Sequence, residues 1–392
     1  MRTEQTGNLQ AKYYQTYNEN VLPILYRYED VRLKILKDFR TKNLIFWLIF
    51  IAVVVVAMFF FFGNSLVDNI FGPSADIYKF IVPVIISGIA EFLIILYIIF
   101  YPIERKKHNN KFSQMLKENI FQELLTAFGD IKWIGHDSLK DNTQSELMDD
   151  TTLDASGLFI DYNTRYIDDE FEGTYKDVPF KICETRMFDI HGSGKSRTCI
   201  CAFSGVIISF KFNKIIKNRT TVSTKGDLTK KHNALCTALL TSVVFINLFE
   251  DGYAHWKVIL IACVFVGVFW IVKMTEKKEE PLNKVNLEDP VFSKRFEVFS
   301  SDQVEARYLV SPAFMERFYN LQTVFGSKKI KCSFYDDTLM IAINTNKNLF
   351  EIGNLFKTLQ DPTSIQEFYK ELCAIYNMIE YFKLDDKNYL TE

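Results

Sequence analysis

The sequence predicts a membrane protein with α-helical transmembrane hairpins and a cytoplasmic α+β domain. Two apolar runs, at 44–62 and 80–101, are each long enough to cross roughly 30 Å of hydrocarbon as a helix. From Gly157 onward apolar and polar residues alternate, a period typical of strands. Apolar residues in 314–325 and 365–382 recur at every third or fourth position, which predicts helices.

Composition narrows the possible functions before any motif is considered. The chain has 392 residues, 48% of them hydrophobic, which allows two or three domains with an ample core. Its formal net charge of −2 argues against a general nucleic-acid binder, which would be strongly basic. The seven cysteines, an odd number without a C-x-x-C pair, predict reduced thiols that face a cytosol. We expect no nucleic-acid partner and no cofactor.

The first two apolar runs, Leu44–Phe62 and Phe80–Tyr101, are predicted transmembrane helices. Two shorter runs follow at Ala234–Phe249 and Val258–Val272. At about 15 residues each, they fall between a spanning helix and a buried core helix. Lysines flank the shorter pair and favour a second spanning hairpin, but a core hairpin stays open for Ala234–Val272.

Basic residues near the ends of the first pair predict its orientation. Arg40 and Lys42 precede the first run and Arg105–Lys107 follow the second, whereas only Lys79 lies between the runs. The positive-inside rule therefore places the N-terminus and everything after Tyr101 in the cytoplasm. The N-terminal stretch "MRTEQTGNLQAKYYQ" has no apolar core, so we expect no cleavable signal peptide.

The predicted organisation has six parts. They are an N-terminal cytoplasmic helix (1–42), a transmembrane hairpin (43–102), a helix and linker (103–154), a β-rich part (155–230), an inserted second hairpin (231–280) and an α+β remainder with a C-terminal helix (281–392). Helical stripes flank the first hairpin on both sides. The first stripe is Val21, Ile24, Tyr28, Val31 and Ile35, and the second is Phe112, Leu116, Ile120, Leu124 and Phe128, with Gly129 as a C-cap. The stripes pack on each other as a stalk, or each docks on the globular domain.

Local signals predict the elements of the cytoplasmic part. The segment "DDTTLDASG" is a polar linker, and "YIDDEFEGTYKDVPFKICETRMFDI" and "TCICAFSGVIISFKF" contain strands. "FEVFSS" is another strand, and Ser311-Pro312 begins a helix. "KIKCSFYDDTLMIAI" predicts two strands around a Tyr-Asp-Asp-Thr turn. The last helix packs on its own domain, although its heptad-like spacing leaves a coiled coil open.

One short motif resembles a phosphate-binding loop. "HGSGKS" ends like a P-loop, but Asp189 stands where the first glycine of that loop belongs. The motif also lies between two predicted strands, so no helix follows to direct its N–H groups at a phosphate. We predict a hairpin loop and no nucleotide.

Three longer stretches resemble a known family. They are "SGLFIDYNTRYIDDEFEGTY", "AFSGVIISFKFNKIIKNRTTV" and "KVNLEDPVFSKRFEVFSSDQVEARYLVSPAFMERF", of which "DQVEARYLVSP" is the most specific. The resemblance is to an uncharacterised bacterial family, the domain of unknown function numbered thirty-one thirty-seven. It implies an N-terminal transmembrane pair followed by this domain, in the bacterial inner membrane. The inserted second hairpin departs from the simplest members, and the resemblance implies no activity.

Four groups of residues are candidate sites. Glu91 is an acid within the second run, where it serves an ion path or stabilises a hairpin or oligomer. Asp168, Asp169 and Glu184 are weak ligands for a divalent cation, with a solvated strand edge as the simpler explanation. A basic run that would attract anionic lipid contains Lys214, Lys217, Arg219, Lys230 and Lys231. Asp302, Glu305 and Arg307 form either a binding site or a structural salt bridge.

No combination of serine, cysteine, histidine and acid suggests catalysis. We therefore predict a membrane-anchored scaffold or sensor that binds a protein partner or anionic lipid, with self-association among the options. An ion-coupled transporter or channel component that uses Glu91 is the alternative, and a metal-dependent hydrolase a further one. The predicted location is the bacterial inner membrane, multi-pass, with both termini cytoplasmic.

Overall fold

The computed structural model describes residues 10–62, 76–135, 145, 147–159, 162–192, 197–227 and 282–381. The predicted second hairpin lies outside these residues. The chain divides into two compact units, which we call the helical unit and the sheet unit. The helical unit comprises 1–129 and 350–369, and the sheet unit comprises 130–349 and 370–392.

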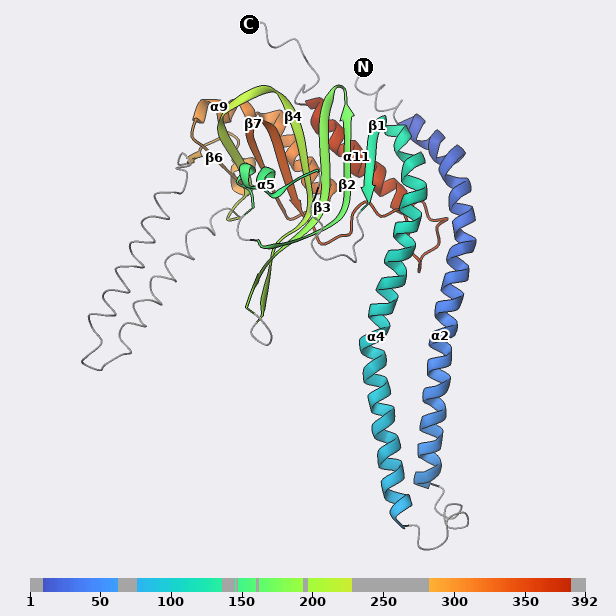
Figure 1. Ribbon diagram of the computed structural model, residues 1–392. Helices are drawn as coiled ribbons and strands as arrows, with labels where there is room; N and C mark the ends of the chain where they lie inside the picture. Colours follow the sequence, from blue (N-terminus) through green and yellow to red (C-terminus); the bar gives the residue numbers. More distant parts are fainter. Residues whose placement is uncertain are drawn as a thin grey trace, which may run out of the picture. The chain divides into compact units, whose positions relative to one another are not determined.

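Two long helices dominate the helical unit. A π-helical turn, η1 (Tyr17–Val21), leads into α2 (Leu22–Phe62), and α4 (Asp76–Leu125) ends in a 3₁₀ turn, η2 (Thr126–Phe128). The two helices lie side by side (Figure 1). Both are long and apolar enough to cross a membrane. In the described residues, Leu44, Leu48, Ile95 and Ile98 are among the large apolar side chains that α2 and α4 leave exposed.

The stripe predicted on α4 and η2 is confirmed, because all five of its residues are buried and Gly129 follows with φ of 97°. The stripe predicted on α2 is confirmed only in part. Val21 is buried and Ile24, Tyr28 and Ile35 are half-buried, whereas Val31 is exposed. The buried residues that follow Val21 lie about one position further along the chain and are Leu25, Arg32, Leu36 and Phe39. The Nη2 atom of Arg32 lies 2.6 Å from Glu29 Oε1 on this face. An apolar pattern does not reveal a buried ion pair.

The charged parts of α2 and α4 hold the segment 350–369 by polar contacts. Arg32 Nη1 donates to the carbonyl of Leu355 at 3.0 Å, and the Leu355 N–H donates to Asn109 Oδ1 at 3.0 Å. Lys117 Nζ lies 2.8 Å from Glu351 Oε1. The helices therefore pack on each other and also on a segment that comes from near the other end of the sequence.

The sheet unit contains one seven-stranded antiparallel sheet. Its strands are β1 (Asp130–Gly135), β2 (Thr164–Tyr175), β3 (Val178–His191), β4 (Thr198–Thr224), β5 (Asn283–Val285), β6 (Phe296–Ser300) and β7 (Lys329–Asn344). Its helices are α5 (Asp150–Ser156), α8 (Pro290–Arg295), α9 (Gln303–Leu309) and α10 (Pro312–Val324). The strand order is β1-β2-β3-β4-β6-β5, and β7 also pairs with β4. Helix α11 (Thr363–Tyr381) belongs to the helical unit up to Tyr369 and to the sheet unit from Lys370.

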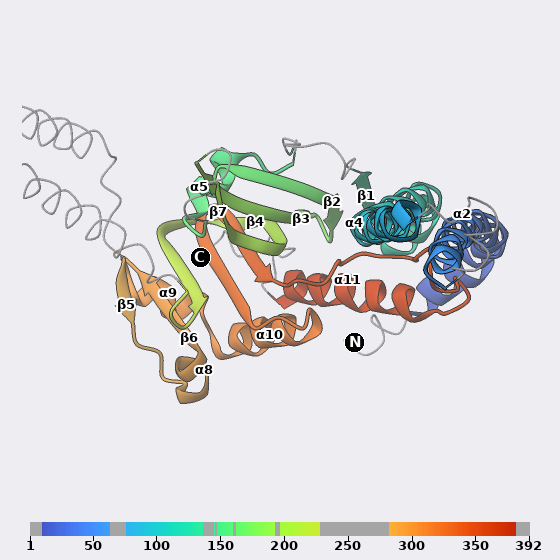
Figure 2. The ribbon, with the colours of Figure 1, turned by 90° about the horizontal axis from the view of Figure 1, so that it is seen from below.

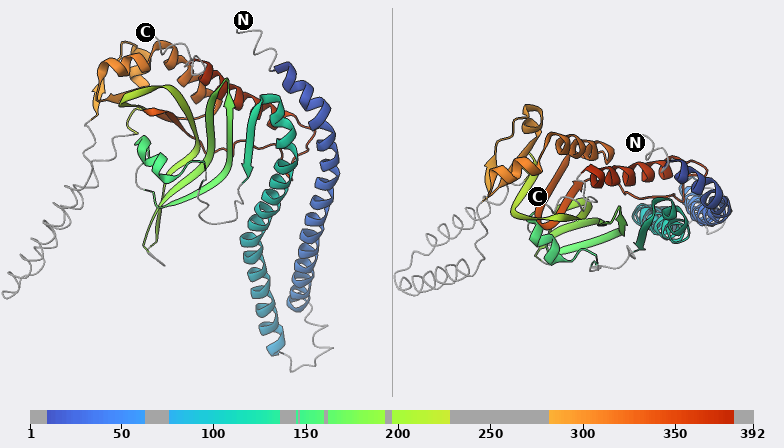
Figure 3. Two further views of the ribbon diagram at one scale, coloured as in Figure 1. Left: turned by 45° about the horizontal axis from the view of Figure 1, so that its top comes forward. Right: turned by 90° about the horizontal axis from the view of Figure 1, so that it is seen from above.

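Strands β4 and β7 are long and bent, and they connect two halves of the sheet (Figures 2 and 3). The first part of β4 pairs with β3, and its last part, Thr220–Thr224, pairs with β6. Strand β7 pairs with both parts of β4. At Gly205, with φ of 150°, β4 approaches β7 so closely that a Cβ atom would lie 2.0 Å from the carbonyl oxygen of Ile343.

Two tight connections agree with the sequence. Strands β3 and β4 pair antiparallel up to His191 and Thr198, which confirms that "HGSGKS" connects two strands of a hairpin. Strands β2 and β3 are joined at Lys176 and Asp177, whose φ values of 50° and 65° are typical of a two-residue hairpin turn.

Two expectations for this unit are wrong, and one strand was missed. Residues 150–156 form α5 rather than a polar linker, because Asp149 caps the helix and Leu153 is buried. Strand β1 was not predicted at all. The Tyr-Asp-Asp-Thr segment is a bend within one strand, since the residues on both sides of it pair with β4.

The two predicted helices near the C-terminus are confirmed. The Ser311 side chain accepts from the Phe314 N–H at the start of α10, which lies along β7 (Figure 2). Its predicted apolar residues Phe314, Phe318, Leu321 and Phe325 are buried. The described part of the α11 stripe, Ile365, Phe368, Leu372, Ile375 and Ile379, is also buried. Its first part packs within the helical unit, where Phe368 contacts the rings of Phe121 and Phe128, so α11 does not pack on the β-rich domain alone.

Candidate functional site at the bends of β4 and β7

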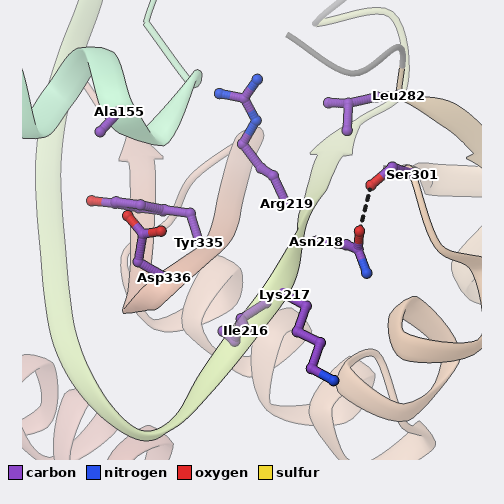
Figure 4. Close-up of a pocket in the computed structure, with 9 residues that line it drawn as sticks. All are labelled: Ala155, Ile216, Lys217, Asn218, Arg219, Leu282, Ser301, Tyr335 and Asp336. Carbon is purple, nitrogen blue, oxygen red and sulfur yellow. Dashed lines mark hydrogen bonds between the residues drawn. The ribbon is translucent and has the colours of Figure 1, made fainter.

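A pocket lies within the sheet unit where β4 and β7 bend (Figure 4). Its volume is about 300 Å³. The residues that line it are Ala155, Ile216, Lys217, Asn218, Arg219, Leu282, Ser301, Tyr335 and Asp336. They come from the end of α5, from both bent strands, and from the residues just before β5 and α9. Most of the lining is polar, so the pocket suits a polar ligand.

The backbone around the pocket is irregular on both strands. Asp336 has φ of 49°, a conformation that is uncommon for residues other than glycine. It pairs with Ile216, and the register shifts on both sides of that pair. Irregular strands of this kind occur often beside binding and active sites, where they redirect side chains. The bend therefore marks this pocket as the candidate site.

Glu305 fixes the β4 side of the pocket from α9. Its carboxylate accepts hydrogen bonds from the Lys217 N–H at 3.1 Å and from the Asn218 N–H and Nδ2, each at 3.0 Å. Asp302 caps α9 by accepting from the N–H groups of Val304 and Glu305. The Asp302 and Glu305 pair of the predicted motif therefore holds the backbone at the bend.

Two further contacts position side chains of the lining. Asn218 Oδ1 accepts from the hydroxyl of Ser301 at 3.2 Å (Figure 4). Arg219 extends to the end of α5, where its guanidinium packs on Gly157 so closely that a Cβ there would lie 2.8 Å from Nη1. A cation at the C-terminal end of a helix is favourable. Arg219 therefore supports α5 and also lines the pocket.

The charged groups of the lining bracket the pocket and do not converge on one atom. Figure 4 shows the guanidinium of Arg219 and the ammonium of Lys217 leaving β4 in different directions. The hydroxyl of Tyr335 donates to the Thr152 carbonyl at 3.4 Å, and burial raises the pKa of Tyr335 to about 12. Catalysis needs a nucleophile and a base within hydrogen-bond reach of each other, whereas this set offers charges and donors that can hold a ligand.

The three residues predicted as weak metal ligands have different structural surroundings. Asp169 is buried and accepts from Trp133 Nε1 at 2.8 Å, and Glu184 accepts from the Leu349 N–H at 3.0 Å. Asp168 is half-buried at the irregular pairing of β2 with β3. Among the described residues, no group of three or more histidine, cysteine, aspartate or glutamate side chains could hold a metal ion.

Sequence reasoning missed a buried polar network beside these acids. Arg165 donates to the Met148 carbonyl at 2.5 Å, to Thr185 Oγ1 at 3.2 Å and to Cys183 Sγ at 3.2 Å. Glu170 is fully buried and accepts from Ser145. Burial raises the pKa of the Cys183 thiol, so the thiol stays neutral and unreactive. A charged triplet such as "DDE" indicates a surface, and only the fold shows that two of these acids are inside.

The remaining predicted residues fall in three places. Glu91 lies on α4 with its side chain exposed. Arg307 is exposed on α9. Of the predicted lipid-facing bases, Lys217 and Arg219 line the pocket. The side chain of Lys214 and all of Lys230 and Lys231 lie outside the described residues.

Comparisons with known proteins identify the domain but not its chemistry. Residues 201–384 match the model of the family described as "Protein of unknown function (DUF3137)", which confirms the family resemblance. No curated protein matches the chain. Among solved structures, the crystal structure of the mycobacterial trehalose monomycolate transport factor A, TtfA, is similar over 64% of this chain and 86% of that chain. The identity is 6% and the TM-score 0.27, too low to bear on fold or function.

Proposed function

We propose that this chain, which carries a DUF3137 domain, is a membrane-anchored scaffold or sensor that binds the acidic headgroup of a lipid in the β4–β7 pocket. Helices α2 and α4 are the anchor, and the sheet unit is the binding module on the cytoplasmic side. The observation that carries the proposal is the lining itself, where Lys217 and Arg219 flank a polar pocket next to an irregular backbone.

The position of these bases in the sequence supports a lipid ligand. They belong to a basic run that precedes the apolar segments at 234–249 and 258–272. Basic residues next to membrane segments attract anionic lipids, at about 1 kcal/mol for each base. Asp336 is the acid of the lining and repels an anion, so the headgroup would lie away from Asp336, in contact with Lys217 or Arg219.

The position of Glu91 bears on the transporter alternative. An ion path between α2 and α4 would need this carboxylate at their contact, whereas the Glu91 side chain is exposed on the hairpin. In a bilayer, an exposed carboxylate of this kind would need a partner from another helix. Glu91 therefore favours self-association within the anchor over conduction through one hairpin.

Headgroup binding can be measured with the full chain in nanodiscs of a phosphocholine lipid. We expect sn-glycerol 1-phosphate to bind, as followed by calorimetry, and Lys217→Ala to weaken its binding about fivefold because one cation is lost. Lys294→Ala is the matched control, since Lys294 is an exposed lysine on α8 outside the pocket. Arg219→Met removes the second cation and should weaken binding by a similar factor.

Unchanged binding in both Lys217→Ala and Arg219→Met would contradict the pocket assignment. If the chain bound phosphatidylglycerol in the nanodisc but did not bind soluble sn-glycerol 1-phosphate, recognition would lie in the acyl region instead. If only an acidic peptide bound in the pocket, the ligand would be a protein partner.

The cytoplasmic orientation has its own test. Cys199 and Cys201 are exposed on the β3–β4 hairpin, whereas Cys183 and Cys332 are buried. A membrane-impermeant maleimide should leave Cys199 and Cys201 unlabelled in intact cells and label them after lysis. Labelling in intact cells would place the sheet unit on the outer side.

A further inference from the structure

A second cavity, of about 300 Å³, lies between α2 and α4 inside the helical unit. The residues that line it are Phe39, Lys42, Asn43, Phe46, Leu96, Tyr97, Phe100, Tyr101, Glu104 and His108. On both helices it spans the point where the apolar run meets the charged part, near Leu44 and Tyr101. If these helices cross a membrane, as proposed above, that point lies at the depth of the lipid headgroups.

Aromatic rings line one side of this cavity in a continuous column. The ring of Tyr97 stacks on Phe46 at 4.6 Å and on Tyr101 at 5.1 Å. Phe39 continues the column, 5.8 Å from Tyr101 and 5.5 Å from His108. Leu96 and Phe100 extend the apolar lining, and the Phe100 side chain is 56% exposed. This surface suits an acyl chain and the ester region of a lipid.

Polar groups at the cavity are available to a ligand. The side-chain amide of Asn43 and the hydroxyls of Tyr97 and Tyr101 form no hydrogen bond with any residue that the structure describes, although all three residues are half-buried. These groups can therefore be satisfied by water or by a ligand that enters the cavity. A lipid ester or phosphate provides suitable acceptors for the amide and hydroxyl hydrogens.

The rim carries charges of both signs, one on each helix. The Lys42 ammonium pairs with Asp38 at 3.0 Å, and both side chains are about two-thirds exposed (65% and 64%). On α4, the Glu104 carboxylate is half exposed and lies 3.7 Å from His108 Nε2 and 4.0 Å from Lys107 Nζ. Exposed ion pairs of this kind are weak, so either partner can turn to a ligand at little cost.

We infer that this cavity binds one phospholipid whose headgroup carries a phosphate and a primary ammonium. Its phosphate lies at Lys42 and Asn43, its ammonium at Glu104, and an acyl chain runs along Leu96 and Phe100. A purely anionic headgroup would meet the repulsion of Glu104 and Asp38. A quaternary ammonium would have no N–H to donate to Glu104. The inference rests on the proposed membrane anchoring, but not on the β4–β7 pocket.

The test is a competition between lipids for the purified full chain. The chain is extracted in mild detergent and mixed with equal amounts of phosphatidylethanolamine, phosphatidylglycerol and phosphatidylcholine with identical acyl chains. Native mass spectrometry then counts the lipid that stays bound. We expect one phosphatidylethanolamine per chain, bound in clear preference to the other two.

Variants locate the site. Lys42→Met and Glu104→Gln should each reduce retention of phosphatidylethanolamine about fivefold, because each removes one charge contact. Glu104→Gln should also reduce the preference for phosphatidylethanolamine over phosphatidylcholine, whereas Lys42→Met should not. Asn43→Trp fills the cavity and should abolish retention. Lys37→Met, which removes an exposed lysine on α2 outside the cavity, should have no effect.

Equal retention of the three lipids, or unchanged preference in Glu104→Gln, would overturn the inference. Circular dichroism of each variant checks that the helices persist. If Asn43→Trp does not fold, Phe100→Ala replaces it, because Phe100 is exposed and its loss removes only lining surface. Fractionation of cells tests the membrane anchoring separately. A chain found outside the membrane fraction would contradict the anchoring, whereas a chain in the membrane fraction that does not select among the lipids would contradict only the lipid site.

Discussion

The helical unit and the sheet unit place their polar groups in opposite ways. In the sheet unit, charged side chains such as Arg165, Glu170 and Lys331 are buried among apolar residues. In the helical unit, buried polar groups gather where 350–369 packs, and large apolar side chains are exposed along the rest of α2 and α4. A domain that encloses its apolar residues and pairs its buried charges is typical of proteins in water, whereas a large exposed apolar surface is typical of contact with hydrocarbon. The exposed apolar surface of α2 and α4 is what the proposed membrane anchoring requires.

The units also differ in what holds them together. The sheet unit depends on backbone pairing, so its weakest points are places where two strands come unusually close. The helical unit depends on side chains that join α2 and α4 to a distant segment. Substitutions that disturb backbone approach should therefore act most strongly in the sheet unit, and substitutions that remove single side-chain contacts should act more mildly in the helical unit.

The largest effect is expected at Gly205. In Gly205→Ala, the new Cβ would lie 2.0 Å from the Ile343 carbonyl oxygen and 2.8 Å from the Thr345 nitrogen, so β4 and β7 must separate. We expect a loss of about 4 kcal/mol or more in the free energy of unfolding, or no folded sheet unit. Chemical denaturation of the full chain in detergent, followed by near-UV circular dichroism, measures it.

Gly226→Ala is the matched control for this prediction. Gly226 also has a positive φ, 81°, but a Cβ there would meet nothing within 4 Å. The control should lose only about 1 kcal/mol, the backbone strain alone. Equal losses in the two variants would show that close approach of the strands does not limit the sheet unit.

The next effect is expected at Arg165, which tests whether the buried charges stabilise the sheet unit. Arg165→Met removes donors to Met148, Thr185 and Cys183 and leaves their acceptors buried. We expect about 3 kcal/mol of lost stability in the same denaturation experiment. Arg186→Met, an exposed arginine on β3, should change stability by less than about 0.5 kcal/mol. If Arg165→Met left the free energy of unfolding unchanged, apolar packing could replace the hydrogen-bond network.

A smaller effect is expected in the helical unit at Arg32. Arg32→Met removes the hydrogen bond to Leu355 and the pair with Glu29, whose pKa the Arg32 side chain keeps below its ordinary value. We expect a loss of about 2 kcal/mol and faster proteolytic cleavage within 350–369. Arg27→Met, an exposed neighbour on α2, should leave cleavage unchanged. Equal cleavage of both variants would show that this segment is held by apolar contacts alone.

Much of the architecture follows from the sequence because it depends on local patterns. The α4 stripe, the Ser311 cap and the β3–β4 hairpin each result from neighbouring residues. The two membrane-length helices likewise need only a count of apolar residues. Periodicity and capping are properties of short windows, so they can be recognised before any tertiary contact is known.

The candidate site could not be derived in the same way because it depends on distant contacts. The sequence predicts Glu305 as a motif residue but not its partners. Its carboxylate accepts hydrogen bonds from the Lys217 and Asn218 N–H groups only because the fold brings α9 next to β4. The same holds for Arg32, a charged residue that lies on the buried face of α2. The bend at Asp336 looks like a turn in sequence, because only the continuous pairing with β4 distinguishes a bent strand from a hairpin.

The smallest effect is expected at Asp149, and it sharpens the comparison by giving the sheet unit a pH signature. Asp149 Oδ1 accepts from the Thr152 N–H at 3.0 Å and Oδ2 accepts from the Thr151 hydroxyl at 2.6 Å. These hydrogen bonds lower the pKa of Asp149 from 3.8 to about 2. A lowered folded pKa means that the cap is fully stabilising above pH 4 and loses its effect as the pH falls toward 2.

Asp149→Ala should therefore cost about 1 kcal/mol at neutral pH, and the difference from the natural chain should shrink as the pH is lowered below 4. Asp149→Asn keeps an acceptor for the α5 N–H groups without a titrating proton. It should therefore be close to the natural chain in stability at neutral pH, and it should lose less stability than the natural chain as the pH falls below 4. Thermal unfolding of the full chain between pH 6 and pH 2.5 measures both variants. A difference between Asp149→Ala and the natural chain that stays constant over this range would mean that the cap stabilises α5 without its charge, and that the acid sensitivity of the sheet unit lies in its buried carboxylates.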